Sequence, residues 1–98
     1  MEEKVGVLAI LTAKPGKEQA VADFLTSALP LAIAETDTVS WYAIQLDGQT
    51  FGIFDTFPHD EGRQKHLSGQ IATALMANAS DLLATAPDIK TITVLAAK

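Results

Sequence analysis

The sequence predicts an α+β domain of the ferredoxin-like kind, with the element order βαββαβ and a four-stranded antiparallel sheet. Two observations carry this prediction. Short apolar runs rich in β-branched and aromatic residues occur near the start, as a pair in the middle, and at the end, and segments with helical apolar spacing lie between them. Helices that connect strands in this order cover one face of the sheet. With 98 residues the chain has room for one core, so we expect a single domain over 1–98.

The first predicted strand covers 5–11, where the apolar run is too short for a helix and is followed by Lys-Pro-Gly at 14–16. A helix then begins near Lys17. Its apolar side chains are spaced at i, i+3, i+4, i+7 and i+8, namely Val21, Phe24, Leu25, Ala28 and Leu29. Pro30 should kink or end this helix, and 31–35 can add a further turn.

Two strands are predicted over 39–46 and 50–57, joined by Asp-Gly-Gln at 47–49. Asp-Gly between two β-rich runs is a strong hairpin signal. The segment 58–61 follows, and its carboxylates suit a helix start, where they can accept backbone N–H bonds.

The second long helix is predicted to run from this start to about Met76. Its apolar stripe consists of Leu67, Ile71, Ala74 and Leu75. A separate short helix is expected at 80–83, ended before Pro87, and the last strand at 89–96.

Both faces of the predicted sheet are mostly apolar. In the strand over 39–46, for example, Val39 and Trp41 alternate with Tyr42 and Ile44. An antiparallel sheet with one wet face should instead alternate apolar and polar residues, and a large exposed apolar patch is rare on a monomer. We therefore expect a second, identical subunit to cover one face, so that the protein is a homodimer.

Composition excludes several classes of function. The formal net charge is −5, and the seven Lys and Arg residues are scattered, which argues against nucleic acid as a partner. There is no long apolar run for a membrane span and no secretory pattern at the start, so we expect no membrane partner and a cytoplasmic location. The chain has no cysteine and no glycine-rich phosphate loop. We expect no cofactor, and no metal site, because His59 precedes the helix that carries His66.

Three stretches give the sequence a family resemblance: Lys-Pro-Gly-Lys-Glu at 14–18, Phe-Asp-Thr-Phe-Pro-His-Asp-Glu at 54–61 with His66 following, and Val-Leu-Ala at 94–96. Together they resemble the antibiotic biosynthesis monooxygenase domain, including its quinol monooxygenase members, over nearly the whole chain. The resemblance implies a ferredoxin-like fold whose sheets pair into a dimeric α+β barrel. The chain departs from the family at 35–37, where Glu-Thr-Asp replaces a frequent Glu-Pro-Gly, and at Phe57, where Trp is frequent.

His66 is the first candidate for a catalytic base, because an imidazole titrates near neutrality and the residue lies at the edge of the predicted buried helix face. The alternative is a half-buried histidine that only bonds a backbone carbonyl. Arg63 and Gln70 lie one turn on either side and extend a polar strip that can bind a carbonyl or carboxylate, or can simply be the solvated border of the helix.

Asp55 falls in an inward-facing register of its predicted strand, where a carboxylate needs a partner. It can orient a base, pair with Arg63, or form a structural ion pair at the dimer seam. Aromatic residues supply flat walls for an aromatic ligand, although core packing also explains most of them: Trp41, Phe24, Phe51, Phe54 and Phe57. His59 is expected to be an exposed loop residue.

The resemblance implies a cofactor-independent monooxygenase that acts on a small, electron-rich aromatic molecule, such as a quinol or an anthrone-like compound. In that hypothesis His66 is the base, Asp55 or Arg63 is its electrostatic partner, and the aromatic residues clamp the ring. The alternatives are a non-catalytic dimeric module that binds a small hydrophobic ligand, and haem binding or degradation. The haem-degrading relatives use Asn, Trp and His; this chain has Trp41 and His66 but no Asn in its first strand.

Overall fold

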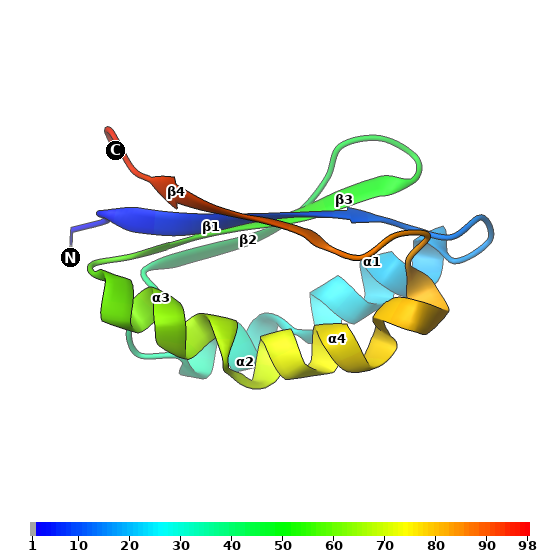
Figure 1. Ribbon diagram of the computed structural model, residues 1–98, viewed down its shortest axis with the longest axis horizontal. Coiled ribbons are helices and arrows are strands. Elements are labelled where there is room, and N and C mark those ends of the chain that lie inside the picture. The colour runs from blue at the N-terminus through cyan, green and yellow to red at the C-terminus, as the bar shows by residue number, and fades with distance from the viewer. Residues whose placement is uncertain (1) are drawn as a thin grey trace.

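A four-stranded antiparallel sheet forms one layer of the structure, and helices cover one of its faces to form the other (Figure 1). The computed structural model describes residues 2–98. The strands are β1 (Val5–Thr12), β2 (Ser40–Gln45), β3 (Thr50–Phe57) and β4 (Asp88–Thr93). The helices are α1 (Glu18–Ser27), α2 (Leu29–Ala34), α3 (Asp60–Leu67) and α4 (Gln70–Leu82). Within these residues, no helix combines the length and apolarity needed to cross a membrane.

The strand order is β2-β3-β1-β4, so the two central strands are the first and third along the chain. This arrangement confirms the predicted α+β, ferredoxin-like fold with its antiparallel sheet. Asp55 pairs in register with Val7 of β1 on one side and with Trp41 of β2 on the other. Side chains of directly paired residues share a face, so these three lie in one row on the helix-covered face.

The hairpin between β2 and β3 forms at the predicted place. Oδ1 of Asp47 accepts the backbone N–H groups of Gln49 at 3.0 Å and of Thr50 at 2.9 Å, which closes the turn. Pro30 also acts as predicted, because α1 ends before it and α2 contains it in its first turn, where a missing N–H costs nothing.

The second half of the helical layer differs from the prediction. A single helix to Met76 was expected, but the chain breaks at Ser68 and Gly69, and α4 then continues without interruption to Leu82. Gly69 is extended, and a Cβ there would lie only 3.1 Å from the carbonyl oxygen of Lys65, so the tight corner favours glycine. The prediction of a separate short helix at 80–83 is therefore wrong, because α4 already includes residues 80–82.

The start of α3 is also capped differently from the prediction. The Nδ1 atom of His59, rather than a carboxylate, accepts the N–H of Gly62 at 3.0 Å. Asp60 and Glu61 lie in the first turn, where their charges oppose the helix dipole. His59 is exposed, as expected, but it has a defined structural task.

The main core lies between the sheet and the pair α1 and α4. Its largest contributors from the sheet and helices are fully or almost fully buried, namely Leu11, Val21, Leu25, Phe51, Ile53 and Leu75. A second, smaller cluster joins Ala28, Ala32 and Ile71 beneath α2, with Trp41 packed against both clusters. The small side chains of Ala28 and Ala32 therefore allow α2 to pack closely beside Ile71 of α4.

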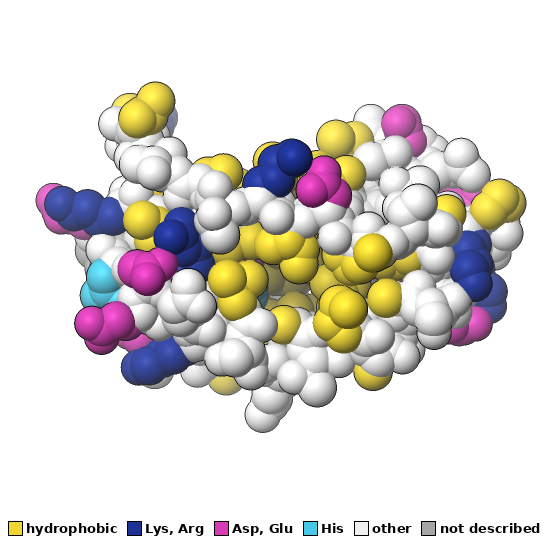
Figure 2. Space-filling view, in the orientation of Figure 1, with side chains coloured by type: hydrophobic (Ala, Val, Ile, Leu, Met, Phe, Trp, Pro, Cys, Tyr) yellow, Lys and Arg dark blue, Asp and Glu magenta, His cyan; other side chains and the backbone are white. Residues whose placement is uncertain are grey.

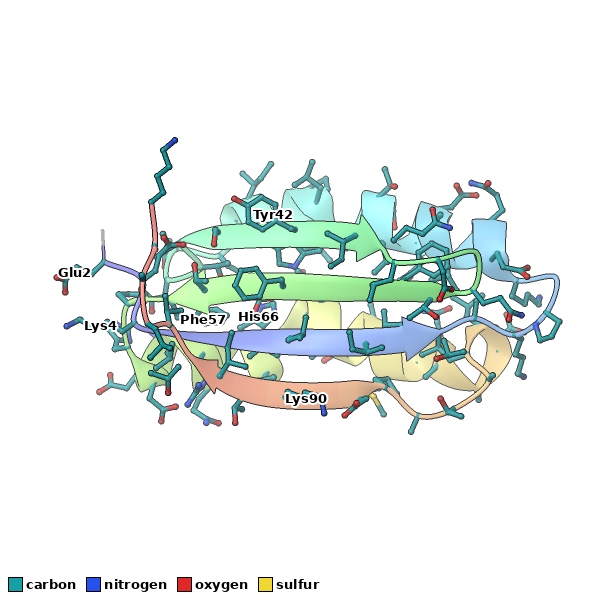
Figure 3. The ribbon with its side chains drawn as sticks, turned by 90° about the horizontal axis from the view of Figure 1, so that it is seen from above. Glu2, Lys4, Tyr42, Phe57, His66 and Lys90 are labelled. Atoms are coloured by element: carbon teal, nitrogen blue, oxygen red, sulfur yellow. The ribbon has the colours of Figure 1, made fainter. Side chains whose placement is uncertain are left out.

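The other face of the sheet has no helix over it (Figure 1). Figure 3 looks onto this face. Tyr42 and Ile44 are 56% and 40% exposed there, and the Tyr42 ring stacks on Phe54 with their centroids 6.4 Å apart. The predicted apolar character of both faces therefore holds for this surface.

A close backbone approach at the centre of the sheet gives a first prediction. A Cβ at Gly6 of β1 would lie 2.6 Å from the carbonyl oxygen of Asp55. We expect Gly6→Ala to lower the free energy of unfolding by about 1–3 kcal/mol, since the central strands must separate to admit it. Gly48→Ala is the control, because a Cβ there meets nothing within 4 Å. Equal unfolding free energies for the two variants in urea titrations would contradict this account.

Candidate functional site

A buried carboxylate and an imidazole meet where α3 crosses β3. The Nε2 atom of His66 lies 2.8 Å from Oδ2 of Asp55. Asp55 is 0% exposed and His66 is 8% exposed, so neither charge is solvated by bulk water. The aromatic ring of Phe57 covers one side of the imidazole, with the ring centroids 5.2 Å apart. The inward register predicted for Asp55 is confirmed, and its charged partner is His66.

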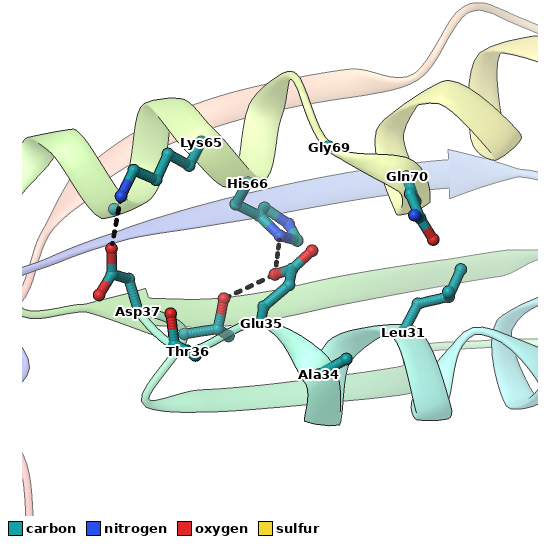
Figure 4. Close-up of a pocket in the computed structure, with 11 residues that line it drawn as sticks. Leu31, Ala34, Glu35, Thr36, Asp37, Lys65, His66, Gly69 and Gln70 are labelled. Carbon is teal, nitrogen blue, oxygen red and sulfur yellow. Dashed lines mark hydrogen bonds and ion pairs between the residues drawn. The ribbon is translucent and has the colours of Figure 1, made fainter.

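A second carboxylate holds the opposite nitrogen of the same imidazole. Nδ1 of His66 lies 2.7 Å from Oε1 of Glu35, as Figure 4 shows. The hydroxyl of Thr38 donates to the same oxygen at 2.6 Å, which fixes the carboxylate in place. Glu35 is the C-cap residue that follows α2, and its extended backbone turns the chain back toward the sheet. Asp55, His66 and Glu35 thus form a line that runs from the interior toward the surface.

The electrostatics of this line favour a bound proton. Burial lowers the pKa of His66, but the hydrogen bonds and charges of Asp55 and Glu35 more than offset it, so that the pKa is raised above its ordinary value. Burial also raises the pKa of Asp55, more than the nearby His66 lowers it. The folded protein therefore holds protons here more tightly than the unfolded chain does.

Asp55 is incompletely satisfied in spite of its contact with His66. The 2.8 Å contact from Nε2 of His66 to Oδ2 is the short polar contact of this carboxylate, and neither oxygen has a further well-aligned hydrogen-bond partner among residues 2–98. Buried polar atoms are rarely left this way, because the lost hydration costs about 1–3 kcal/mol. The free oxygens mark a position where an additional polar group can bind.

Two hollows adjoin the line from opposite sides. The larger, here called the Glu35 pocket, has a volume of about 320 Å³ and lies between α2, α3 and the start of α4 (Figure 4). It is lined by Leu31, Ala34, Glu35, Thr36, Asp37, Thr38, Gly62, Lys65, His66, Gly69 and Gln70. This volume falls in the range typical of small-molecule sites. Lys65 and Asp37 form an ion pair of 3.3 Å in its wall.

The smaller hollow, here called the Asp55 cleft, has a volume of about 30 Å³ and lies between the sheet and α4. Apart from Asp55 and His66 its walls are apolar: Val7, Ala9, Ile53, Leu67, Ile71, Ala72, Leu75 and Ile89. Figure 2 shows hydrophobic side chains around a hollow between the sheet and the helices on this side of the molecule. His66 is the one residue that lines both the Glu35 pocket and the Asp55 cleft.

Asp55, His66 and Glu35 are arranged in a line, which is unsuited to binding a metal ion. The two carboxylates lie on opposite ring nitrogens instead of converging on one point, and within residues 2–98 no three His, Asp or Glu side chains are grouped to hold a metal ion. What the line can do is accept, hold and pass on protons.

Arg63 does not join the line, contrary to the hypothesis that it partners His66 or Asp55. Its guanidinium bonds Asp60 at 2.8 Å and reaches the backbone carbonyls of Gly6 at 3.3 Å and Ile92 at 3.1 Å. These contacts attach α3 to β1 and β4. Gln70, in contrast, lies in the wall of the Glu35 pocket beside His66, as the polar-strip hypothesis requires.

The aromatic residues expected to clamp a ligand do not line the Glu35 pocket or the Asp55 cleft. Phe51 and Phe57 are buried in the interior, and Phe24 packs against the main core. Phe54 is on the uncovered face of the sheet, one residue out of register with the site. Trp41 lies beside Asp55, but its buried Nε1 has no hydrogen-bond partner within residues 2–98. The predicted aromatic walls are therefore wrong for this pocket.

Glu35 was not singled out from the sequence as a site residue. It follows an apolar helical segment, a place where a glutamate commonly faces solvent, and 31 positions separate it from His66. No local pattern connects the two residues. Only the packing of α2 beside α3 brings them together.

The fold and this geometry allow a comparison with known proteins. No protein-family model and no curated protein matches the sequence. Solved structures do match, and they include proteins provisionally assigned as antibiotic biosynthesis monooxygenases. One from Nitrosomonas europaea is 12% identical with a TM-score of 0.83, covering 97% of this chain and 94% of its own. One from Caulobacter crescentus is 15% identical with a TM-score of 0.81, covering 97% and 92%. At these identities the likeness shows a shared fold.

A much closer likeness is to another Nitrosomonas europaea protein, described as a protein of unknown function. It is 54% identical with a TM-score of 0.96, over 98% of this chain and 93% of that one. The present chain belongs to the same family as that protein.

The raised pKa values predict how stability depends on pH. Because native His66 and Asp55 bind protons more tightly than the unfolded chain, the free energy of unfolding falls as pH rises through the native pKa of each group. For His66 this loss starts above its ordinary pKa of 6.5, with a slope of at most about 1.4 kcal/mol per pH unit for each extra proton held. Urea unfolding of the wild type between pH 6 and 9 measures the slope.

His66→Gln should remove most of this slope, whatever it does to stability at a single pH. His59→Asn is the matched control, since asparagine also caps a helix and His59 does not touch the carboxylates. A wild-type stability that rises over this pH range would contradict the assignment.

Proposed function

We propose that this protein is a cofactor-independent monooxygenase that oxidises a small, electron-rich phenolic molecule, such as a quinol or an anthrone-like compound, in the Glu35 pocket. The observation that carries the proposal is the imidazole held between two carboxylates in the wall of a ligand-sized pocket. Two features support it: the fold shared with provisionally assigned antibiotic biosynthesis monooxygenases, and the family resemblance of the sequence.

The chemistry needs a base and a sheltered pocket. Singlet organic molecules react slowly with triplet dioxygen, but a phenolate can give up an electron to it and so start the reaction. One oxygen atom of O₂ then enters the product, the other leaves as water, and the substrate itself supplies all the electrons. Proton removal from the phenol is therefore the step that the protein must promote.

The structure refines which group meets the substrate. Both ring nitrogens of His66 already contact carboxylates, whereas the two contacts of Glu35 both fall on Oε1. Oε2 of Glu35 therefore has no such contact within residues 2–98 and can take the phenolic proton. In this proposal His66 stands behind Glu35 as the base that receives the proton, and Asp55 stabilises the resulting imidazolium. Leu31 and Ala34 contact the ring, and Gln70 binds a ring oxygen.

Activity assays with a panel of quinols test the proposal. We expect His66→Ala and Glu35→Gln each to lower kcat by about 10²-fold or more, since general-base catalysis contributes about 10²–10⁴-fold. Oxygen uptake and product chromatography measure the rate above uncatalysed oxidation, with His59→Asn as the control. The wild-type rate should rise with pH through the raised pKa of His66, because the base must be unprotonated. If His66→Ala oxidises the panel as fast as the wild type, the mechanism is wrong.

A non-catalytic binding module is the other outcome of this experiment. In that case a phenolic ligand raises the melting temperature without any product. The haem alternative is not favoured by the site, because neither ring nitrogen of His66 is free for iron.

We also propose that the protein is a homodimer in which two copies pack their uncovered sheet faces together, as in a dimeric α+β barrel. The support comes from the apolar and aromatic side chains on that face, which include Leu8, Ile10, Tyr42, Ile44 and Phe54. A second copy presents the same apolar side chains and buries them. Lys90 and Asp88 of β4 share this face, and they pair with each other at 3.3 Å.

A charge on this face tests the dimer. We expect Ile44→Asp to convert a dimer into a monomer at micromolar concentration in analytical ultracentrifugation, because a buried unpaired carboxylate costs several kcal/mol. Met76→Asp is the control, since Met76 is a 60% exposed apolar residue of α4. A wild-type protein that sediments as a monomer would rule out the dimer.

A further inference from the structure

The Asp55 cleft is the feature of the site that the proposed function leaves unexplained. It adjoins His66 on the side away from the Glu35 pocket, and the two hollows share no other residue. A ligand in the Glu35 pocket would cover the Glu35 end of the line. The Asp55 end would stay in contact with the cleft.

The size and chemistry of the cleft fit water. A volume of about 30 Å³ admits a water molecule but no organic ligand. Its walls are apolar except at Asp55 and His66, so a water there has its strongest partner in the carboxylate of Asp55, which has capacity for further hydrogen bonds. Such a water also supplies the hydrogen bonds that the fully buried carboxylate lacks.

We propose that the Asp55 cleft holds a water molecule on Asp55 and is the route by which protons leave the site when the Glu35 pocket is occupied. This role rests on the proposed function, although the route itself does not. The contacts of 2.7 Å and 2.8 Å make the line continuous from Glu35 through His66 to Asp55.

Each proton transfer along the line conserves charge and atoms. A neutral His66 with its hydrogen on Nε2 accepts a proton from Glu35 at Nδ1 and gives the Nε2 proton to Asp55. Asp55 then passes that proton to the water in the cleft, and from there it reaches solvent. Asp37 and Lys65 also line the Glu35 pocket, but they pair with each other and do not touch His66.

Blocking the cleft without altering the line tests the route. Ala72 lines the cleft from α4, whereas Ala77 is exposed on the same helix and lines neither hollow. Ala72→Leu therefore fills the cleft, and Ala77→Leu is the matched control with the same change in helix propensity. Ala72→Val is a smaller replacement in case leucine prevents folding.

The measurement is the exchange of the His66 ring proton on Nε2 with water, followed by NMR in protein labelled with ¹⁵N-histidine. We expect Ala72→Leu and Ala72→Val to slow this exchange several-fold, and Ala77→Leu to leave it unchanged. A crystal structure of the wild type should show a water on Asp55 that is missing from Ala72→Leu. Exchange in both Ala72 variants as fast as in the wild type, or a dry wild-type cleft, would overturn the proposal.

The exchange measurement, together with the quinol assay, distinguishes failure of the proton route from failure of the proposed function. If the wild type oxidises no quinol but the Ala72 variants slow the exchange, the route stands and the oxygenase proposal fails. If quinols are oxidised and the exchange is unaffected, the oxygenase proposal stands and the route is wrong.

Discussion

The burial of Asp55 is the constraint on which the helical layer depends. A carboxylate removed from water costs several kcal/mol unless an opposite charge or hydrogen bonds compensate it. Here the compensation comes from His66, so α3 must cross β3 at the position where Nε2 comes within 2.8 Å of the carboxylate. Glu35 then holds the other ring nitrogen and ties the end of α2 to the same point. One buried charge thus places two helices relative to the sheet.

The two halves of the second helical segment are stabilised in different ways, which explains why the chain breaks between them. Only Gly62 and His66 are buried in α3, and its attachments are polar: the His59 cap and the bonds from Arg63 to strand carbonyls. In α4 the buried residues are Ile71, Leu75 and Leu82, a conventional apolar stripe. The corner at Gly69 lets each half present its own kind of face to the sheet.

Features set by local residue patterns could be predicted from the sequence, whereas features set by the packing of separate elements could not. The positions of the first three strands and the inward register of Asp55 follow from the local alternation of residues, so they were predicted correctly. The last strand was predicted over 89–96, but β4 ends at Thr93, because residues 94–96 continue the apolar run without a neighbouring strand to pair with. The helix boundary was missed because Leu67 continues the apolar spacing of Ile71 and Leu75 across the break, while the steric reason for the corner lies in backbone contacts of Gly69. Glu35 and the walls of its pocket depend on how separate helices pack, and periodicity within one segment carries no information about that. The aromatic residues were misplaced for a related reason, because side chains suited to a ligand are equally suited to a core.

The position of one imidazole between two carboxylates narrows the chemistry open to this protein. With Nδ1 and Nε2 both occupied, His66 is a poor metal ligand and a poor nucleophile, since either role needs a free nitrogen. Each carboxylate favours the protonated ring, and the line from Asp55 through His66 to Glu35 connects the buried interior with the partly exposed pocket wall. A purely structural ion pair would need only one of the carboxylates. The second carboxylate, placed in the wall of a ligand-sized pocket, is what makes proton transfer to or from a bound molecule the function that best accounts for the whole arrangement.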